Sequence, residues 1–323
     1  MIEHILPGLW RIEVPLPENP LQAVNSYLLK GDGRFLIIDT GMNMEVCAKA
    51  LNAGLQQLNV DLKKTDFFVT HLHHDHMGLV SALATEGAKV YFNQPEIPIM
   101  RQFTSNTRWA TLLNFNVANG FSEKELINSM PNLSYLYGTK QLPFIALHDG
   151  DGFEIGEYCF TCIETPGHSP GHICLYEKDK KLLVSGDHIL FDITPNITWY
   201  PEMPNSLERY LHSLDKVYPL DVELVLPGHR KHQNNHRARI REIQEHHNIR
   251  LKETAAALES GEKTAYDVAA NISWDITYTS WEDFPVTQKY FAVGETIAHL
   301  QYLADAKRIR KYAADGKTLY SLA

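Results

Sequence analysis

Short apolar segments separated by glycine-containing turns dominate the first ninety residues of the chain. Residues 9–14 alternate between apolar and polar side chains, and two apolar runs flank Gly31-Asp32-Gly33-Arg34, a turn typical of a hairpin. Longer stretches with apolar residues at helical spacing follow. The pattern predicts strands at 9–14, 26–30, 35–38, 66–69 and 89–92, and helices at 43–59 and 78–86.

Residues 95–145 interrupt this rhythm with prolines and with helical pieces rich in aromatic side chains, Trp109 and Phe115 among them. Long insertions in compact domains are more often functional than accidental, so we interpret this segment as a cap or lid. A helical pair packed on a sheet edge is the alternative. The strand pattern then resumes. We expect strands at 153–163, 172–177, 181–185 and 222–226, and a helix that begins at Ser206.

Residues 234–260 form a long helical pattern that is rich in arginine, with Arg237, Arg239, Arg241 and Arg250. A solvated charged face is the default interpretation, and a groove for an anionic substrate is the alternative. Residues 262–323 combine helices with a final hairpin. Their aromatic residues predict packing against the rest of the chain or against a second subunit in a homodimer. These residues are Trp274, Trp281, Phe284, Tyr290 and Phe291.

Composition narrows the class of protein. The 323 residues suffice for one large domain or two, and the 44% hydrophobic content allows a sizeable core. The net charge of −9 argues against a general binder of polyanions, so we do not expect nucleic acid as a partner. Four cysteines inside apolar runs predict buried free thiols and a reducing cytoplasm. Without the pattern of a signal peptide or a bilayer-spanning stretch, we expect a cytoplasmic protein with no membrane partner.

The stretch richest in chemistry is Thr70-His71-Leu72-His73-His74-Asp75-His76-Met77-Gly78, between the predicted strand at 66–69 and the helix that follows. A strand-to-helix turn lets its imidazoles and carboxylate converge on one point, and such groups suit zinc, iron or manganese. Three later strands also end in glycine-containing turns with a histidine or an aspartate. These turns carry His168 and His172, then Asp187 and His188, and finally His229.

Together and in this order, the four turns resemble the metallo-β-lactamase superfamily, with its H-x-H-x-D-H motif, over about residues 1–235. The resemblance implies an α/β fold: a four-layer αββα sandwich that forms a catalytic domain at 1–235, with 95–145 as a helical cap insertion. The helix–helix–hairpin order near the C-terminus is similar to the winged-helix-like module of the β-lactamase-like-protein-2 subgroup. That similarity implies a linking helix at 236–260 and a small winged-helix-like domain at 261–323.

The resemblance also implies two divalent metal ions, with zinc expected first and iron or manganese as alternatives, in a ligand set similar to that of glyoxalase II. Asp39 matches an early aspartate of the family that orients a ligand; a strand-end cap is its alternative role. The implied ligands are His71, His73 and His168 for the first metal, Asp75, His76 and His229 for the second, and Asp187 as the bridge.

Several residues near these turns are candidates for supporting or substrate-binding roles. We expect His172 to hold a metal ligand in place without binding the metal itself. His188, Tyr200, Arg230 and Trp109 are candidate substrate contacts. An ordinary turn histidine is the alternative for His188, and a surface role is the alternative for Arg230.

Two cations that share a hydroxide create a nucleophile at neutral pH, and Asp75 is the carboxylate best placed to take up its proton. We therefore predict a hydrolase for a small-molecule ester, thioester or lactone. Leu190 stands where lactonases of the family carry a tyrosine, which weakens the lactone interpretation. One alternative is a ribonuclease or phosphodiesterase, suited to the basic helix but opposed by the negative charge. A non-catalytic metal-binding regulator is another, although such a protein would be expected to have lost ligands.

Overall fold

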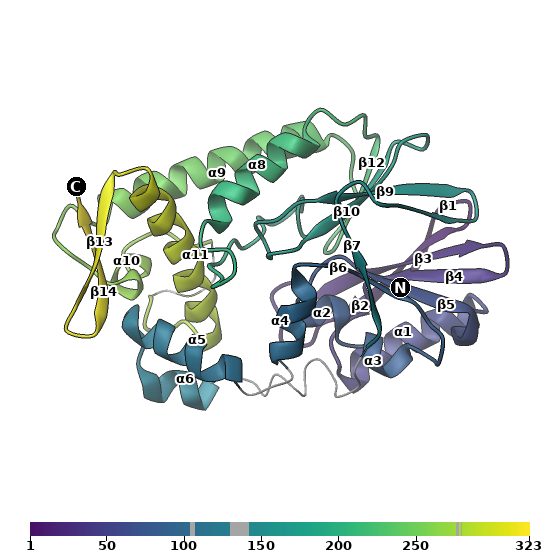
Figure 1. The fold of residues 1–323 in the computed structure, drawn as a ribbon, viewed down its shortest axis with the longest axis horizontal. Coiled ribbons are helices and arrows are strands. Elements are labelled where there is room, and N and C mark those ends of the chain that lie inside the picture. Colours follow the sequence, from purple (N-terminus) through teal and green to yellow (C-terminus); the bar gives the residue numbers. More distant parts are fainter. Residues whose placement is uncertain (104–106, 130–141, 276–277, 279) are drawn as a thin grey trace.

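The computed structural model describes residues 1–103, 107–129, 142–275, 278 and 280–323. Two β-sheets lie face to face and carry helices on their outer sides (Figure 1). The first sheet has the order β1-β2-β3-β4-β5-β6-β7 and the second has the order β12-β11-β10-β9-β8. The strands of the first sheet are β1 (Ile2–Leu6), β2 (Leu9–Pro15), β3 (Ala23–Gly31), β4 (Arg34–Ile38), β5 (Thr65–Val69), β6 (Val90–Asn93) and β7 (Phe144–Leu147). Those of the second are β8 (Gly152–Ile155), β9 (Tyr158–Glu164), β10 (Ile173–Glu177), β11 (Leu182–Gly186) and β12 (Leu224–Pro227).

Each sheet changes from antiparallel to parallel pairing at one point. Strands β1 to β4 pair as antiparallel neighbours, whereas β4, β5, β6 and β7 are parallel. In the second sheet, β11 and β12 are the parallel pair and the remaining pairs are antiparallel. Because parallel strands end at the same edge of a sheet, the turns after β4 and β5 lie close together. The same holds for the turns after β11 and β12.

Helices cover both outer faces. The outer face of the first sheet packs against α1 (Glu45–Gln57), α2 (His74–Met77), α3 (Val80–Leu83) and α4 (Glu96–Phe103), and a 3₁₀ turn, η1 (Leu62–Lys64), precedes β5. The second sheet packs against α8 (Ser206–Val217) and α9 (His236–Ala256). The remaining elements are α5 (Thr107–Ala118), α6 (Glu123–Ser129), α10 (Ala265–Ala269), α11 (Val286–Asp305), β13 (Ile309–Ala314) and β14 (Lys317–Leu322).

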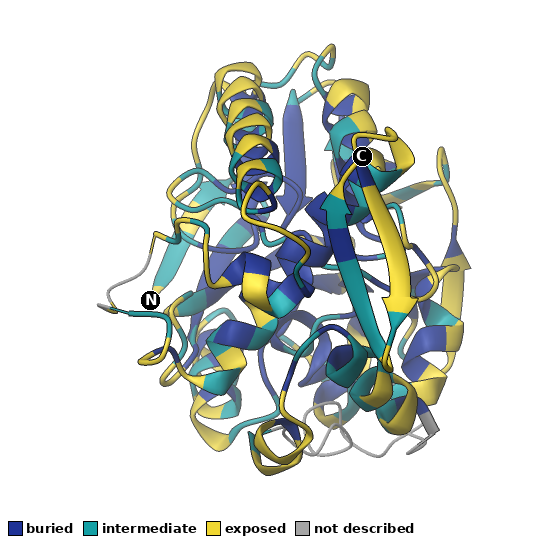
Figure 2. Ribbon diagram, turned by 90° about the vertical axis from the view of Figure 1, so that its left-hand side faces the viewer, coloured by how far each residue is buried: buried dark blue, intermediate teal, exposed yellow. Residues whose placement is uncertain are grey.

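Three apolar clusters correspond to the three contacts between layers. Tyr27 and Leu175 belong to the cluster between the sheets, whereas Leu51 of α1 belongs to the cluster under the first sheet. The third cluster joins the second sheet to α8, α9, α10 and α11. Burial is concentrated in the strands and the inner helix faces, and β13 at the C-terminal end is largely exposed (Figure 2). The predicted αββα sandwich is therefore confirmed.

The insertion and the C-terminal segment pack on each other. Tyr266 donates its backbone N–H to the Asn119 carbonyl, and the Lys317 ammonium donates to the Val117 carbonyl. Leu126 of α6 belongs to the same apolar cluster as α10 and α11. Figure 1 shows α5 and α6 beside these C-terminal elements. A cap role for 95–145 stays a prediction, and its parts at 104–106 and 130–141 lie outside the described residues.

The predicted packing of the C-terminal aromatics on the rest of the chain is observed for most of them. Trp274, Trp281 and Tyr290 lie against the third apolar cluster and Phe284 is buried, but Phe291 is 48% exposed. Residues 265–322 have the expected helix–helix–hairpin order. The boundaries at 235 and 260 and the winged-helix assignment stay predictions.

Several expected elements differ in detail. The strand predicted at 153–163 is two strands with a turn at Gly156, and the helix predicted at 78–86 is replaced by the short helices α2 and α3. The sequence pattern did not reveal β1, whose residues are only half-buried at a sheet edge. Cys159 is exposed, unlike the other three thiols, because its strand alternates between two faces.

None of the described helices has the length and apolar character needed to cross a membrane.

A close backbone contact between the sheets yields a stability prediction. A Cβ added at Gly31, the last residue of β3, would lie 2.1 Å from the backbone nitrogen of Gly156, in the turn that joins β8 to β9. We expect Gly31→Ala to lower the free energy of unfolding by about 1–3 kcal/mol, because backbone has to move. Gly152→Ala is the matched control, since its Cβ would meet only an ordinary contact at 3.5 Å. Urea unfolding of both variants measures the difference; equal stabilities would contradict the tight contact.

Candidate metal centre

The sheet edges bring together the four turns that the sequence singled out. The turn after β5 carries His71, His73, Asp75 and His76, and the turn between β9 and β10 carries His168. The parallel strands β11 and β12 end just before Asp187 and His229. Residues more than 150 positions apart in the sequence therefore meet in one buried centre.

Three imidazoles form the first group of donor atoms. His71, His73 and His168 offer ring nitrogens that all lie within 4.8 Å of one another. His71 Nε2 faces His73 Nδ1 at 2.9 Å, and His168 Nε2 is buried without a hydrogen-bond partner. Three converging imidazole nitrogens are a typical donor set for a transition metal.

A second group lies beside the first. Asp75, His76 and His229 also have donor atoms within 4.8 Å of one another, with 3.3 Å between the Nε2 atoms of the two histidines. Asp187 Oδ2 lies 3.4 Å from His229 Nε2 and 3.5 Å from the Nε2 atoms of both His76 and His168. This carboxylate therefore contacts imidazoles of both groups, the position expected of a bridging ligand.

The protein fixes the outer nitrogen of each ring. His168 Nδ1 donates to the Asn196 carbonyl at 2.8 Å, and His229 Nδ1 donates to the Ala23 carbonyl at 2.7 Å. His76 Nδ1 lies 2.7 Å from the Asp39 carboxylate. A histidine that donates from one nitrogen presents a bare lone pair on the other, which is the form that binds a metal.

The outer nitrogens of the other two rings are held by hydroxyl groups. Thr70 donates its hydroxyl hydrogen to Asp39, so the same oxygen accepts from His71 Nδ1 at 3.0 Å. The Tyr200 hydroxyl lies 2.7 Å from His73 Nε2. All five imidazoles thus turn one nitrogen inward, and the donor set fits two metal ions.

The electrostatics of the centre favour bound cations. Burial alone would raise the pKa of Asp187, but His229 and His76 outweigh burial and hold it well below its usual value. Burial would lower the pKa of His229, yet the Asp187 carboxylate beside it raises this pKa to about 10. For His71, burial dominates and keeps the pKa well below its usual value, so the ring is neutral. The buried carboxylates thus favour a proton on inward-facing imidazole nitrogens. A bound metal cation would supply the same positive charge.

Comparison with known proteins places this centre in a family. The model of the metallo-beta-lactamase superfamily matches residues 19–229, about two thirds of the chain. This chain belongs to the metallo-β-lactamase superfamily. The probable metallo-hydrolase YqjP of Bacillus subtilis is 27% identical over 325 residues, with 96% of each chain covered. The human acyl-coenzyme A thioesterase MBLAC2 is 28% identical over 237 residues, which cover 69% of this chain and 78% of that protein.

Solved structures agree with this assignment. The crystal structure of a metallo-beta-lactamase family protein from Thermus thermophilus superposes with a TM-score of 0.86, at 26% identity over 99% of this chain and 100% of that one. Membership of the metallo-β-lactamase superfamily, together with the intact donor set, makes the chain a metal-dependent hydrolase. Its place in the β-lactamase-like-protein-2 subgroup stays a prediction.

Residues behind the donor atoms support the centre of this superfamily member. His172 Nε2 accepts the backbone N–H of Asp187 at 3.1 Å, while its Nδ1 pairs with the Thr165 hydroxyl at 2.8 Å. Gly186 has φ +48°, and a Cβ there would lie 2.7 Å from His172 Nε2. A Cβ at Gly228 would lie 2.3 Å from Asp187 Oδ1. Gly228 therefore leaves room for the Asp187 carboxylate, and Gly186 leaves room for the His172 ring.

The candidate substrate residues are in different surroundings. His188 is fully buried, with its ring centroid 5.4 Å from that of Tyr210, and burial lowers its pKa to about 3. Its role, whether a substrate contact or an ordinary turn histidine, stays a prediction. The Arg230 guanidinium donates to the Pro20 carbonyl at 2.7 Å and to the Gln22 side chain. Whether it contacts substrate or has a surface role stays a prediction. Trp109 is half-buried on α5. His74 belongs to neither group of donor atoms.

Glu96 is a residue that the sequence analysis missed. It is fully buried at the start of α4, and its carboxylate accepts from the Ser169 hydroxyl and from the backbone N–H of Gly171 at 3.0 Å. Burial raises its pKa to about 8. Glu96 therefore braces the turn that carries His168. No local motif marks this residue, because its partners lie more than 70 positions away.

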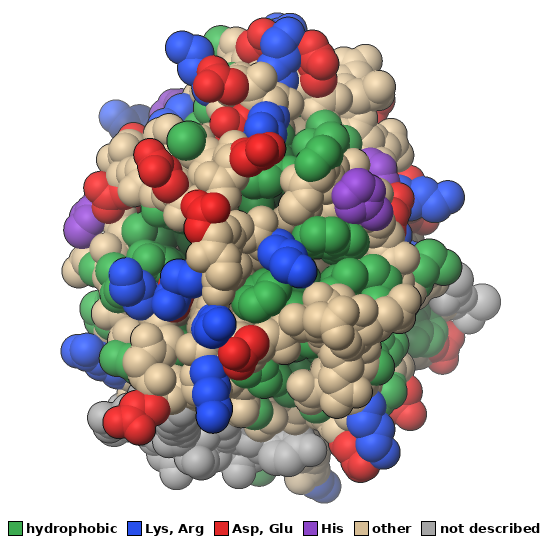
Figure 3. All heavy atoms as spheres, turned by 90° about the vertical axis from the view of Figure 1, so that its right-hand side faces the viewer, with side chains coloured by type: hydrophobic (Ala, Val, Ile, Leu, Met, Phe, Trp, Pro, Cys, Tyr) green, Lys and Arg blue, Asp and Glu red, His purple; other side chains and the backbone are tan. Residues whose placement is uncertain are grey.

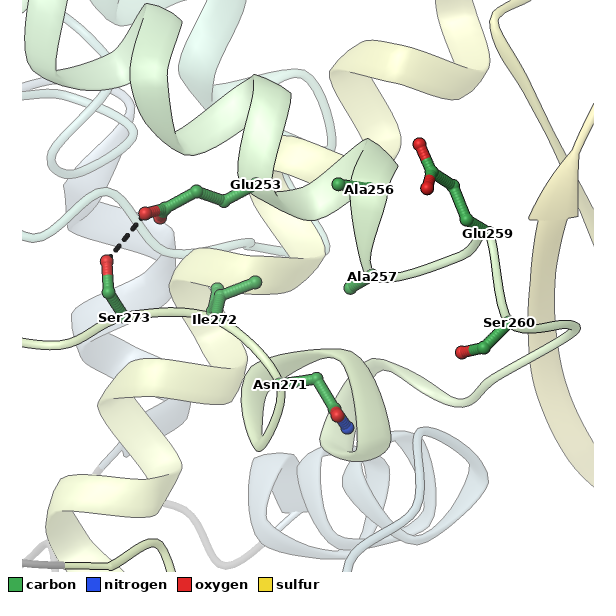
Figure 4. A pocket seen from close by; sticks show the side chains of 8 residues that line it. All are labelled: Glu253, Ala256, Ala257, Glu259, Ser260, Asn271, Ile272 and Ser273. Atoms are coloured by element: carbon green, nitrogen blue, oxygen red, sulfur yellow. Dashed lines mark hydrogen bonds between the residues drawn. The ribbon is translucent and has the colours of Figure 1, made fainter.

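A surface pocket of about 470 Å³ lies elsewhere, between the end of α9 and the segment after α10 (Figure 4). Glu253 and Glu259 contribute carboxylates to its lining, and the Ser273 hydroxyl donates to Glu253 at 2.6 Å. None of its lining residues belongs to the four turns of the metal centre. The pocket is therefore separate from the candidate active site.

Two aspartates of the centre have roles that mutation distinguishes. We expect Asp187→Ala to abolish activity and metal retention more completely than Asp39→Ala. Asp187 contacts both groups of donor atoms, whereas Asp39 contacts the ring of His76 and reaches His71 only through Thr70. Loss of a group that orients a ligand costs about 10–100-fold in affinity or activity. Activity and metal content of both variants are compared after equal metal loading. Equal losses at equal metal content would show that the two roles are assigned wrongly.

Proposed function

We propose that this protein hydrolyses carboxylic thioesters of the acyl-coenzyme A class with two divalent metal ions held by the seven donor residues. The observation that supports this proposal is the position of Asp187 between two groups of inward-facing imidazoles. Structural metal sites are closed and often rich in cysteine, whereas this donor set contains only nitrogen and oxygen ligands and is shared between two ions. Zinc is the expected metal, with iron or manganese as alternatives.

Two metals in this centre would supply hydroxide at neutral pH and polarise the scissile carbonyl. The residues of the chain would hold the metals and orient the attacking water. His71, His73 and His168 would fix the first metal, and the Asp75 carboxylate would orient the attacking water and take up its proton. Attack on the carbonyl carbon forms a new C–O bond and breaks the C–S bond. The thiolate leaves and takes up a proton, so the products are a carboxylate and a thiol.

The thioester class is supported by the similarity to MBLAC2, which is named an acyl-coenzyme A thioesterase. Two arginines of α9 are bound to backbone carbonyls. Arg239 donates to the carbonyls of Leu190 and Ile193, and Arg237 donates to carbonyls at the end of α8. The contacts of Arg237 and Arg239 weigh against the ribonuclease alternative. On the face at the right of Figure 1, basic and acidic side chains are interspersed (Figure 3).

The proposal is tested by metal analysis and a substrate panel on the same preparation. We expect close to two transition metals per chain, and hydrolysis of acyl-coenzyme A thioesters faster than that of lactones, phosphodiesters or RNA. Exposure to a chelator should remove the activity, and adding zinc or manganese should restore it. Protein that stays metal-free after supplementation would refute the dinuclear centre. Metal-loaded protein that cleaves RNA but no thioester would refute the substrate class alone.

The aromatic side chains of α5 yield a specificity prediction. If the insertion forms a wall of the substrate site, Trp109→Ala should change the ratio of kcat/KM between short and long acyl chains by about tenfold, because a methylene contact is worth about 1–3 kcal/mol. Metal content should be unchanged. Ile127→Ala is the control, since this exposed side chain lies on α6 of the same insertion. An unchanged ratio in Trp109→Ala would assign the insertion a purely structural role.

A further inference from the structure

One loop holds two of the three imidazoles in the first group. Residues 190–200, termed here the ligand-support loop, leave the centre shortly after Asp187. The Asn196 carbonyl accepts from His168 Nδ1 at 2.8 Å, and the Tyr200 hydroxyl pairs with His73 Nε2 at 2.7 Å. The orientation of both rings therefore depends on where this loop lies.

The loop is in turn held by the C-terminal helix α11. The Asn196 side-chain amide donates to Glu295 Oε2 at 2.9 Å. One residue earlier on the helix, a Cβ added at Gly294 would lie 2.2 Å from the Thr198 hydroxyl oxygen. The loop thus lies directly against the helix backbone, and a buried carboxylate aligns it there.

The Glu295 carboxylate is itself fixed. It is 7% exposed, and the Arg250 guanidinium of α9 lies 3.7 Å from Glu295 Oε1. Arg250 also pairs with Glu253 at 2.9 Å, so its position does not depend on Glu295 alone. Removing Glu295 would take away the partner that the Asn196 amide and the Arg250 guanidinium share. Among the described residues, the amide would keep only its longer bond, at 3.4 Å, to the Phe291 carbonyl, and weaker pairing of a partly buried polar group costs free energy.

Two further contacts hold the loop from other sides. The rings of Phe115 on α5 and Trp199 stack at a centroid distance of 3.8 Å. Arg239 of α9 donates to the carbonyls of Leu190 and Ile193 at 2.6 Å and 2.9 Å. The loop is therefore held between the insertion, α9 and α11, all of which lie outside the two sheets.

We infer that Glu295 is a positioning residue for the metal centre: by holding Asn196, it keeps His168 in the orientation that binds the first metal. This inference rests on the proposed function, because it takes His168 as a ligand. It also gives α11 a role in the reaction although this helix carries none of the donor residues. The physical link is a chain of three contacts from the Arg250 guanidinium through Glu295 and Asn196 to the ring of His168.

The test compares three variants of the full chain. Glu295→Ala removes the nearer of the two acceptors of the Asn196 amide, and the Phe291 carbonyl at 3.4 Å is the other. Glu295→Gln keeps a carbonyl oxygen that can accept from the amide. Thr296→Val is the matched control, because this buried neighbour on α11 donates its hydroxyl to the Ala292 carbonyl of its own helix. Zinc affinity is measured by competition with a chromophoric chelator, and thioester kinetics and melting temperature are measured on the same samples.

We expect Glu295→Ala to bind one of its two metals about tenfold more weakly, the lower end of the range for groups that orient a ligand. Its kcat should fall by a similar factor with little change in KM. Glu295→Gln should recover most of the affinity, and Thr296→Val should match the wild type. A purely structural role for Glu295 predicts a lower melting temperature with both zinc affinities unchanged, and that result would overturn the inference.

A second variant covers the case in which Glu295→Ala fails to fold. Asn196→Ala breaks the same link from the loop side, at a half-buried position, and keeps the backbone carbonyl that His168 needs. It should show the same loss of affinity for one metal, and full affinity would again overturn the inference. Wild-type protein that binds no metal would instead refute the proposed function, so the two failures are distinguishable.

Discussion

The buried carboxylate of Asp187 is the constraint on which the centre depends. It is 5% exposed and lies within 3.5 Å of imidazole nitrogens from three different turns. A buried charge is costly unless it is paired, so the fold has to bring positive charge or a metal to this point. The arrangement of turns, glycines and hydrogen-bonded imidazoles around Asp187 follows from that requirement.

The two sheets meet the requirement through their parallel pairs. Asp39 follows β4 and Thr70 follows β5, so the Asp39 carboxylate can accept both the backbone N–H and the hydroxyl of Thr70 while it contacts His76. Asp187 and Gly228 follow the parallel strands β11 and β12, where the absence of a side chain at Gly228 leaves space for the carboxylate. Each sheet thus contributes part of the set of possible metal ligands, and the apolar contact between the sheets holds the two parts together.

The elements outside the sandwich are more closely connected to the centre than their sequence positions indicate. The insertion and the C-terminal helices share an apolar cluster with the second sheet, and the loop after Asp187 packs against both. A change in these peripheral helices can therefore reach His168 without touching any donor residue. Such supporting contacts orient the ligands of a metal site, and losing one typically costs about 10–100-fold in metal affinity or activity.

The sequence by itself determined the strand-and-turn order, the family and the set of converging histidines and aspartates, because these features are local: each donor follows a short apolar strand and a glycine-containing turn. It did not determine the edge strand β1, the exposure of Cys159 or the role of Glu96, since these depend on what packs against each residue. The sequence predicted that Arg239 and Arg250 belong to a charged, solvated helix face. In the structure, Arg239 donates to loop carbonyls and Arg250 pairs with the buried Glu295 carboxylate. Only the tertiary structure decided which outer partner fixes each imidazole, because those hydrogen bonds join residues up to 206 positions apart and leave no periodic trace in the chain.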